Sequence, residues 1–270
     1  MPKSNCWISE NVYDSQVASK RRQQMVDPFA SLVMVFGAVF VPIAIGGTIG
    51  VIIGETTGRK PVMIASAIGI LVWLFLDLMS DSSFLDVNRG LEGGWGQVAI
   101  FITFVAGLGI LVLVDHDFLD SKPAPTYVAL LAAVAMGFHS AGEAMELGGA
   151  LATVGLDVIL GLPALSFILH KILEGFVLSA FLVVGVQTPS FKRSMLQSAI
   201  VGAFALLAEP LGYLSLFESS YFFAMGAGGT IYMIWRLVFH TSGSDGRTLV
   251  LSGFVIGFIF VYLAALLHAA

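Results

Sequence analysis

Long apolar runs alternate with short polar segments along almost the whole chain. The runs are about 20 residues long, which is the length that a helix needs to cross the hydrocarbon core of a bilayer. They lack strict two-residue alternation, which favours helices over the strands of a barrel. The pattern predicts an all-α polytopic membrane protein with eight transmembrane helices, at 29–54, 60–79, 96–115, 126–151, 162–186, 194–216, 219–239 and 248–268.

The polar segments between the runs are too short to form a soluble domain. We expect a polar N-terminal tail over 1–27, without the apolar core of a signal peptide, and a single transmembrane domain over 28–270. Composition agrees, because 57% of the 270 residues are hydrophobic and 11% are charged, whereas a soluble domain carries about 25% charged residues. The single cysteine excludes an intrachain disulfide and a cysteine-rich metal site.

The distribution of Lys and Arg predicts which way the chain crosses the membrane. Eight spans place both termini on the same side. Cytoplasmic loops carry an excess of Lys and Arg. Seven such residues lie in loops opposite the termini, namely Arg59, Lys60, Lys122, Lys192, Arg193, Arg236 and Arg247. Five lie on the terminal side, namely Lys3, Lys20, Arg21, Arg22 and Arg89. We therefore expect a multi-pass protein of the cell membrane with both termini outside.

Two short strings inside apolar runs carry the candidate chemistry. Each reads H-x-x-x-E, from His139 to Glu143 and from His170 to Glu174. Positions i and i+4 share a helix face, so each His should lie beside its Glu. Imidazole and carboxylate are ligands that borderline divalent metals prefer. An ionisable group at membrane depth costs about 2.5–3.5 kcal/mol on insertion scales, and a bound metal would offset that cost.

The two strings should meet in space. The fourth and fifth spans are antiparallel neighbours, and each string lies close to the middle of its span. Two carboxylates would neutralise a divalent cation, which makes its burial tolerable. The sequence therefore predicts a metal site between the fourth and fifth spans, with His139, Glu143, His170 and Glu174 as ligands.

Further polar residues could belong to a cation pathway. Glu146 follows His139 by seven residues and shares its face, and Asp77 and Glu209 also fall in the outer half. These three suggest an acidic approach to the site. Glu209 precedes Pro210, whose kink would free a backbone carbonyl beside the carboxylate. On the inner side, the acidic segment around His116 is either a solvated loop or an exit relay.

Lys171 requires a separate explanation, because a Lys at that depth must be paired or neutral. It follows His170 directly, so it should point about 100° away from the His/Glu face. Glu209 is the expected partner. An ammonium group close to the site would repel a second cation, so we expect one bound metal ion rather than two.

These residues resemble the ZIP family of divalent metal transporters. The fourth-span pattern of that family, H-N-x-x-E/D-G, is matched by His139, Ser140 and Glu143, with Ala144 in place of Gly. The fifth-span pattern, H-E/D-x-P-E-G, corresponds to His170, Lys171, Glu174 and Gly175, with Lys171 in place of the acidic residue and Leu173 in place of Pro. The E-P-L-G of the sixth span is present as Glu209 to Gly212, and Asp77-Leu78-Met79 resembles the end of the second span without its Pro.

The resemblance implies eight spans with both ends outside, and uptake of zinc or an iron-like divalent metal toward the cytoplasm. It makes His139, Glu143, His170 and Glu174 the primary ligands. In family members with two metals, the positions of Ser140, Lys171 and Glu209 help to bind the second ion. Ser is a weaker ligand and Lys is a cation, which agrees with a single metal site here. The long His-rich loop common between the third and fourth spans is absent.

Two other functions fit part of the pattern. An integral membrane metalloenzyme, such as a metal-dependent lipid hydrolase, would use a metal-activated water, but a separate acid/base motif is missing. A retinal-type photoreceptor with Lys171 as Schiff base would leave the paired strings unexplained. We therefore expect a carrier and not an enzyme, with zinc first and iron, manganese and cadmium as alternatives. The metal is cargo and no prosthetic group is expected. The expected partners are the metal ion and the lipid bilayer, with a homodimer as a possible assembly and no nucleic acid.

Overall fold

The structure is a computed structural model that describes residues 26–55, 60–89, 95–115, 126–185, 189–241 and 247–266. These residues are 93% helical and contain no strand. Their eight α-helices are α2 (Pro28–Glu55), α3 (Lys60–Arg89), α4 (Trp95–Val114), α5 (Thr126–Thr153), α6 (Leu162–Gly185), α7 (Phe191–Tyr213), α8 (Ser219–Thr241) and α9 (Arg247–Leu266). A short 3-10 helix, η1 (Gly155–Ile159), joins α5 to α6. The predicted N-terminal tail lies almost entirely outside the described residues.

The helices confirm the predicted fold class. Within the described residues, seven helices, α2 to α8, are long and apolar enough to cross a bilayer, while the apolar stretch described in α9 is shorter, Leu251–Val261. The chain is an all-α polytopic membrane protein, and the predicted count of eight spans is approximate. The second predicted span was too short, because α3 continues to Arg89. Hydropathy marks the edge of the hydrocarbon core, and a helix can continue beyond that edge with polar residues.

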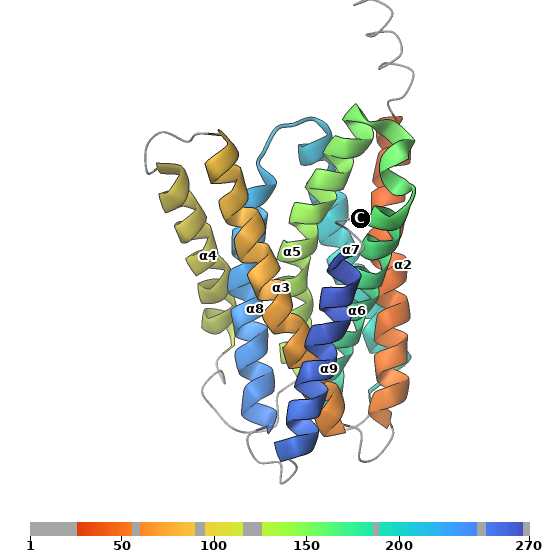
Figure 1. Ribbon diagram of the computed structural model, residues 1–270, viewed down its shortest axis with the longest axis vertical. Coiled ribbons are helices and arrows are strands. Elements are labelled where there is room, and N and C mark those ends of the chain that lie inside the picture. The colour runs from red at the N-terminus through yellow and green to blue at the C-terminus, as the bar shows by residue number, and fades with distance from the viewer. Residues whose placement is uncertain are drawn as a thin grey trace, which may run out of the picture.

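The helices stand side by side in one bundle (Figure 1). We call the end at which α2 begins the upper end. The backbone N–H of Val26 donates to the carbonyl of Leu151 at 3.4 Å, and the hydroxyl of Tyr213 donates to the carbonyl of Val26 at 2.8 Å. These two bonds hold the start of α2 against the last turns of α5 and α7. The start of α5 lies at the opposite, lower end (Figure 1).

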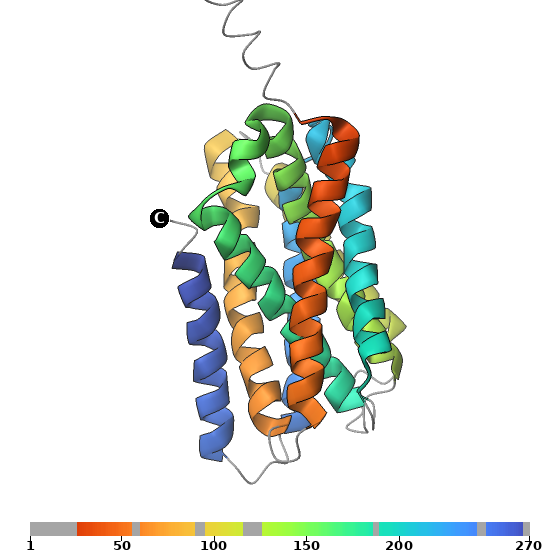
Figure 2. The same ribbon diagram turned by 90° about the vertical axis from the view of Figure 1, so that its right-hand side faces the viewer.

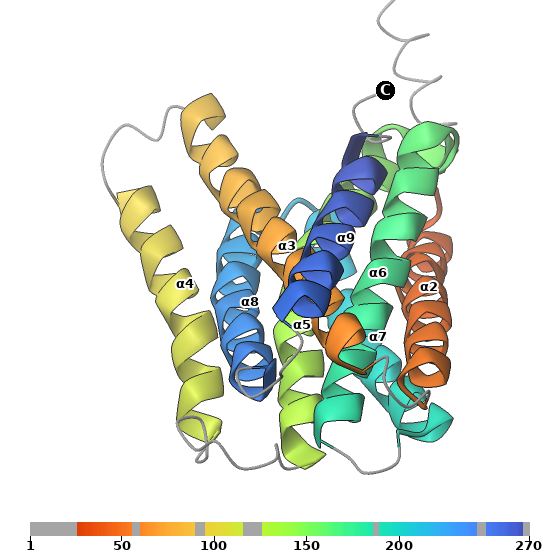
Figure 3. The ribbon, with the colours of Figure 1, turned by 60° about the horizontal axis from the view of Figure 1, so that its bottom comes forward.

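The central helices are those that carry the two H-x-x-x-E strings. α5 packs against α7 and α8, and α6 packs against α2. Figure 2 shows α9 at the margin of the bundle beside α3, and Figure 3 shows α4 at another margin beside α8. The strings are therefore surrounded by helices rather than placed on the lipid-facing surface.

Two glycines let α2 and α6 touch along their backbones. A Cβ at Gly46 would lie 1.8 Å from the carbonyl oxygen of Ile172, and a Cβ at Gly175 would lie 2.1 Å from the carbonyl oxygen of Ile43. Side chains at these positions would push the helices apart, as is usual where membrane helices pack through small residues. Because Gly175 follows Glu174, this contact fixes the position of α6 at the level of the second string.

Candidate metal centre

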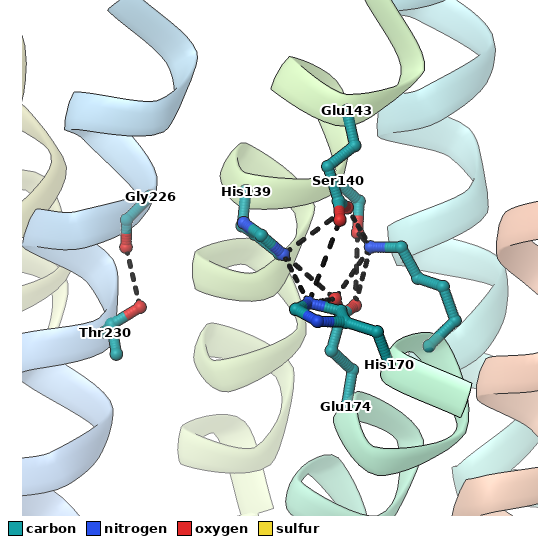
Figure 4. A network of polar contacts seen from close by, with 8 residues as sticks. His139, Ser140, Glu143, His170, Glu174, Gly226 and Thr230 are labelled. Carbon is teal, nitrogen blue, oxygen red and sulfur yellow. Dashed lines mark hydrogen bonds and ion pairs between the residues drawn. The ribbon is translucent and has the colours of Figure 1, made fainter. Parts of the chain in front are cut away.

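The two strings converge in the middle of the bundle. α5 contributes His139 and Glu143, and α6 contributes His170 and Glu174. One ligand atom from each residue lies within 4.8 Å of the corresponding atom of the other three. Figure 4 shows the four side chains directed toward one another from the two helices. We call these four residues the His/Glu centre.

The ring nitrogens and carboxylate oxygens of the centre are within contact distance of one another. The Nε2 atoms of His139 and His170 are 3.4 Å apart. Both approach the same oxygen, Oε1 of Glu174, at 2.9 Å and 3.0 Å. Glu143 lies on the other side, with Oε2 3.3 Å from Nε2 of His139 and Oε1 3.8 Å from Nε2 of His170. All four residues therefore direct their ligand atoms to one small volume.

The spacing of these atoms fits a tetrahedral ion. Zinc binds imidazole nitrogen at about 2.0–2.1 Å, so two nitrogens on one tetrahedral ion lie about 3.3–3.4 Å apart. The observed separation of the two Nε2 atoms is 3.4 Å. The nitrogen-to-oxygen distances to Glu174 are a few tenths of an ångström shorter than this ideal, so small adjustments of the side chains would complete the coordination. Two neutral imidazoles and two carboxylates supply both the ligands and the charge.

The centre is buried unevenly. His139 is 2% exposed and Glu174 is fully buried, whereas the side chains of His170 and Glu143 keep 11% and 15% of their surface. Charged groups without solvent need partners. The buried half of the centre has protein partners around it, while the half formed by Glu143 and His170 remains partly accessible.

Lys171 points into the centre, so the prediction that it points away toward Glu209 was wrong. Its Nζ donates to both oxygens of Glu174, at 2.7 Å and 2.9 Å, and also forms an ion pair with Glu143. The side chain is fully buried and its ammonium lies 5.6 Å from the centre of the Phe167 ring. The prediction used only the direction of the Cα–Cβ bond. The four-carbon side chain of Lys171 is long enough to bend back to the carboxylate of Glu174, three residues later.

Ser140 completes the contacts of this ammonium. Its hydroxyl accepts a hydrogen bond from Nζ of Lys171 at 2.9 Å and lies 3.4 Å from Oε2 of Glu174. The two carboxylates of the centre thus face one fixed cation, so these three groups together carry one net negative charge. One added divalent ion would leave the group with one positive charge, and a second would meet strong repulsion.

Helix α8 closes the side of the centre that His139 occupies. A Cβ at Gly226 would lie 2.9 Å from the Cα of His139, so glycine is needed for this close approach. Within the described part of the chain, Nδ1 of His139 is buried without a hydrogen-bond partner. A metal-bound imidazole normally donates its second N–H to an acceptor. Among the described residues, this nitrogen of the centre has no such acceptor.

Helix α3 contributes an aromatic neighbour that the sequence did not suggest. The ring of Trp73 packs edge-on against the ring of His170, with 6.4 Å between centroids and 70° between planes. The polar contacts of His170 with the described residues named here involve Nε2. Trp73 limits rotation of the imidazole by packing against the ring.

The acidic residues assigned to an approach lie on three helices, α3, α5 and α7, and the approach itself stays a prediction. Glu146 is exposed and accepts a hydrogen bond from the hydroxyl of Ser219 at 3.1 Å. Asp81, one turn beyond Asp77 on α3, interacts electrostatically with Asp77, Glu143 and both histidines of the centre. Asp77 and Glu146 interact in the same way. The sequence analysis missed Asp81 because it placed the end of the second span two residues earlier.

Glu209 is placed differently from the other acidic residues. It is 2% exposed, and its Oε1 accepts a hydrogen bond from the hydroxyl of Ser31 at 2.5 Å. This contact joins α7 to α2. α7 continues through Pro210 to Tyr213. Glu209 is therefore not among the four residues whose ligand atoms converge, and it is not the partner of Lys171.

A second buried ionic cluster lies at the lower end. Asp115, just after α4, is 1% exposed, and Arg236 on α8 is equally buried. The guanidinium of Arg236 donates to both oxygens of Asp115, at 2.6 Å and 2.7 Å. The hydroxyls of Tyr232 and Tyr127 donate at 2.8 Å and 3.0 Å. We call these four residues the Asp115 cluster.

This cluster corrects two expectations. Asp115 begins the acidic segment around His116 that was expected to be either a solvated loop or an exit relay, and Arg236 was counted among the loop residues that set orientation. Both are buried and paired. Removing Arg236 leaves six basic residues against five in the orientation count. Burial alone would raise the pKa of Asp115, but hydrogen bonds from Arg236, Tyr232 and Tyr127 lower it below its ordinary value. His116 lies outside the described residues.

Neither protein-family models nor curated protein sequences give a match to this chain. The geometry of the His/Glu centre is therefore the main basis for a functional proposal.

Proposed function

We propose that the protein is a carrier for divalent metal cations, zinc first, with one metal bound at the His/Glu centre during transport. The observation that carries the proposal is the convergence of two imidazoles and two carboxylates inside a membrane-spanning bundle. Four such groups at this depth are costly unless they serve a ligand. The ZIP-like strings at the same positions support the same proposal.

The surroundings of the centre support a carrier that is closed on one side. On α5, Glu143 of the centre is partly exposed, and Glu146, almost one turn further toward the upper end, is exposed. Below the centre, Ala132, Ala135 and Met136 are fully buried and apolar. An ion that reaches the centre from the upper end thus meets a dry barrier toward the lower end. A transported ion would require that barrier to open.

Transport toward the cytoplasm follows if the upper end faces outward. The six-to-five excess of Lys and Arg on the side opposite the termini supports this orientation, as does the resemblance to the ZIP family. Lys171 supports the binding of one metal ion per chain. Its ammonium is already paired with Glu143 and Glu174, so a second cation would be repelled.

The test is metal flux into proteoliposomes loaded with a divalent-metal indicator. Zinc, iron(II), manganese and cadmium are compared for wild type, His170→Ala and Glu174→Gln. Glu55→Gln is the matched control, since Glu55 is an exposed carboxylate at the end of α2. We expect saturable flux in wild type and in the control, and none in the two centre variants. Metal binding without flux would reject the carrier and favour the metalloenzyme, which a lipid-hydrolysis assay would then test.

A further inference from the structure

The Asp115 cluster connects three helices at the lower end of the bundle. Asp115 follows α4, Tyr232 and Arg236 lie one turn apart on α8, and Tyr127 lies in the first turn of α5. Both oxygens of Asp115 accept two hydrogen bonds each, one from Arg236 and one from a tyrosine hydroxyl. The buried carboxylate is thus fully satisfied, as a buried charge must be.

The four bonds divide unequally between the helices. Three of them, from Arg236 and Tyr232, hold α4 to α8, which pack closely against each other. The fourth, from the hydroxyl of Tyr127, joins α5 to that pair. α5 carries His139 and Glu143, so this bond couples a ligand-bearing helix to the α4–α8 pair.

The same region of α5 forms the dry barrier below the centre. Ala132 lies seven residues before His139, on the same helix face, and is fully buried, as are Ala135 and Met136. A Cβ at Gly229 of α8 would lie 3.0 Å from the Cβ of Ala135, so α5 and α8 are in direct contact here. Separation of α5 and α8 along this contact would open a way from the centre toward the lower end.

We propose that the hydrogen bond from Tyr127 to Asp115 is a latch that keeps the lower end closed. When it breaks, Asp115 keeps three donors, including both guanidinium bonds, so its charge stays compensated. The break therefore involves one hydroxyl and leaves no unpaired buried ion. This inference rests on the proposed carrier function, because it assigns the latch to the opening step through which the metal is released.

The test compares two single-hydroxyl deletions at the same carboxylate. Tyr127→Phe removes the bond from α5, and Tyr232→Phe removes the bond within the α4–α8 pair. Both are made with Cys6→Ser and Ala132→Cys, so that one thiol reports on the dry barrier. Alkylation of Cys at 132 by a polar maleimide is timed in nanodiscs, where both membrane faces are accessible. One hydrogen bond corresponds to roughly a three- to tenfold shift in an equilibrium.

We expect Tyr127→Phe to raise the alkylation rate by roughly this factor and Tyr232→Phe to leave it at the parent rate. An unchanged rate in Tyr127→Phe would overturn the latch, and so would an equal increase in both variants, which would indicate general loosening. Zinc flux by the same proteins separates the two proposals. If wild type transports zinc but Tyr127→Phe and Tyr232→Phe are alkylated at the same rate, the latch alone is rejected. If the expected alkylation pattern appears but wild type transports no zinc, the carrier is rejected and the Tyr127 bond remains as a contact that closes the lower end.

Discussion

Two buried ionic clusters lie in this bundle, and they differ in how completely their groups are paired. In the Asp115 cluster, one carboxylate faces one guanidinium and two hydroxyls, and every carboxylate oxygen has two donors. The His/Glu centre has two carboxylates and two imidazoles, with the ammonium of Lys171 beside the carboxylates, and Nδ1 of His139 has no partner among the described residues. In the first cluster Asp115 and Arg236 are each 1% exposed, while in the second the side chains of His170 and Glu143 keep 11% and 15% of their surface.

This difference separates a group that stabilises the fold from a group that awaits a ligand. A buried ion pair with all hydrogen bonds made has nothing to gain from a further ion. Two imidazole nitrogens lie 3.4 Å apart and against one carboxylate oxygen, and the polar contacts of the Lys171 ammonium described above are with the carboxylates and Ser140, so the ligand capacity of the imidazoles is not used by it. A divalent cation would use that capacity. Substitutions in the two clusters should therefore have opposite signatures.

The largest effect on stability is expected from Asp115→Asn. The substitution leaves Arg236 buried without a counter-charge, which costs about 3–5 kcal/mol. Zinc affinity of the folded fraction should be unchanged, because the cluster does not contact the His/Glu centre. Unfolding in detergent measures the first quantity and equilibrium dialysis the second. Asp157→Asn, at an exposed residue of η1, is the control and should stay within about 0.5 kcal/mol of wild type.

Acid should weaken the same cluster in the wild type. The pKa of Asp115 in the folded protein lies below its ordinary value of 3.8, through its hydrogen bonds with Arg236 and the two tyrosines. The stabilisation is therefore complete above the unfolded-state pKa and is lost as the pH falls through the lower folded-state pKa. Melting temperature measured from pH 6 downward should fall less steeply in Asp115→Asn than in wild type. Parallel curves would contradict the assignment.

Lys171→Gln tests the difference between the two clusters at the His/Glu centre. It removes the fixed positive charge between Glu143 and Glu174, so a divalent cation meets two carboxylates without competition. Zinc affinity should rise by at least about tenfold, and the metal-free protein should lose stability because the two carboxylates repel. Zinc should restore that stability. Lys60→Gln, at the exposed start of α3, controls for the loss of a positive charge. A fall in zinc affinity in Lys171→Gln would show that the ammonium supports binding.

Ser140→Ala is expected to have the smallest effect. It removes one hydrogen bond to the ammonium of Lys171, which keeps its contacts with Glu143 and Glu174. The cost should be about 0.5–1.5 kcal/mol in unfolding, with zinc affinity within a factor of about three. Loss of zinc binding in this variant would make Ser140 a ligand.

The sequence predicted most of the fold and the membership of the centre. Apolar runs of the right length gave the helices, and the i, i+4 spacing placed His139 beside Glu143 and His170 beside Glu174. Both inferences depend only on local helix geometry and on the antiparallel packing of consecutive helices, which a short connection enforces. The ligand role of the four residues stays a prediction.

The contacts that depend on the reach of a side chain or on distant helices were not predicted. Lys171 bends back into the centre, which its Cα direction did not reveal. Asp115 and Arg236 are 121 residues apart, and each lies near the end of an apolar run, where a charged residue is normally solvated. Trp73 contacts His170 from α3, and an edge-on aromatic contact leaves no trace in sequence spacing.

Zinc stoichiometry by equilibrium dialysis tests the central claim most directly. Wild type and Tyr232→Phe should each bind one zinc per chain, because the Asp115 cluster is separate from the centre. His170→Ala should bind at least about 100-fold more weakly, beyond the 10–100-fold cost of losing a mere supporting contact, while keeping a melting temperature close to that of wild type. One zinc bound with wild-type affinity by His170→Ala would contradict the account.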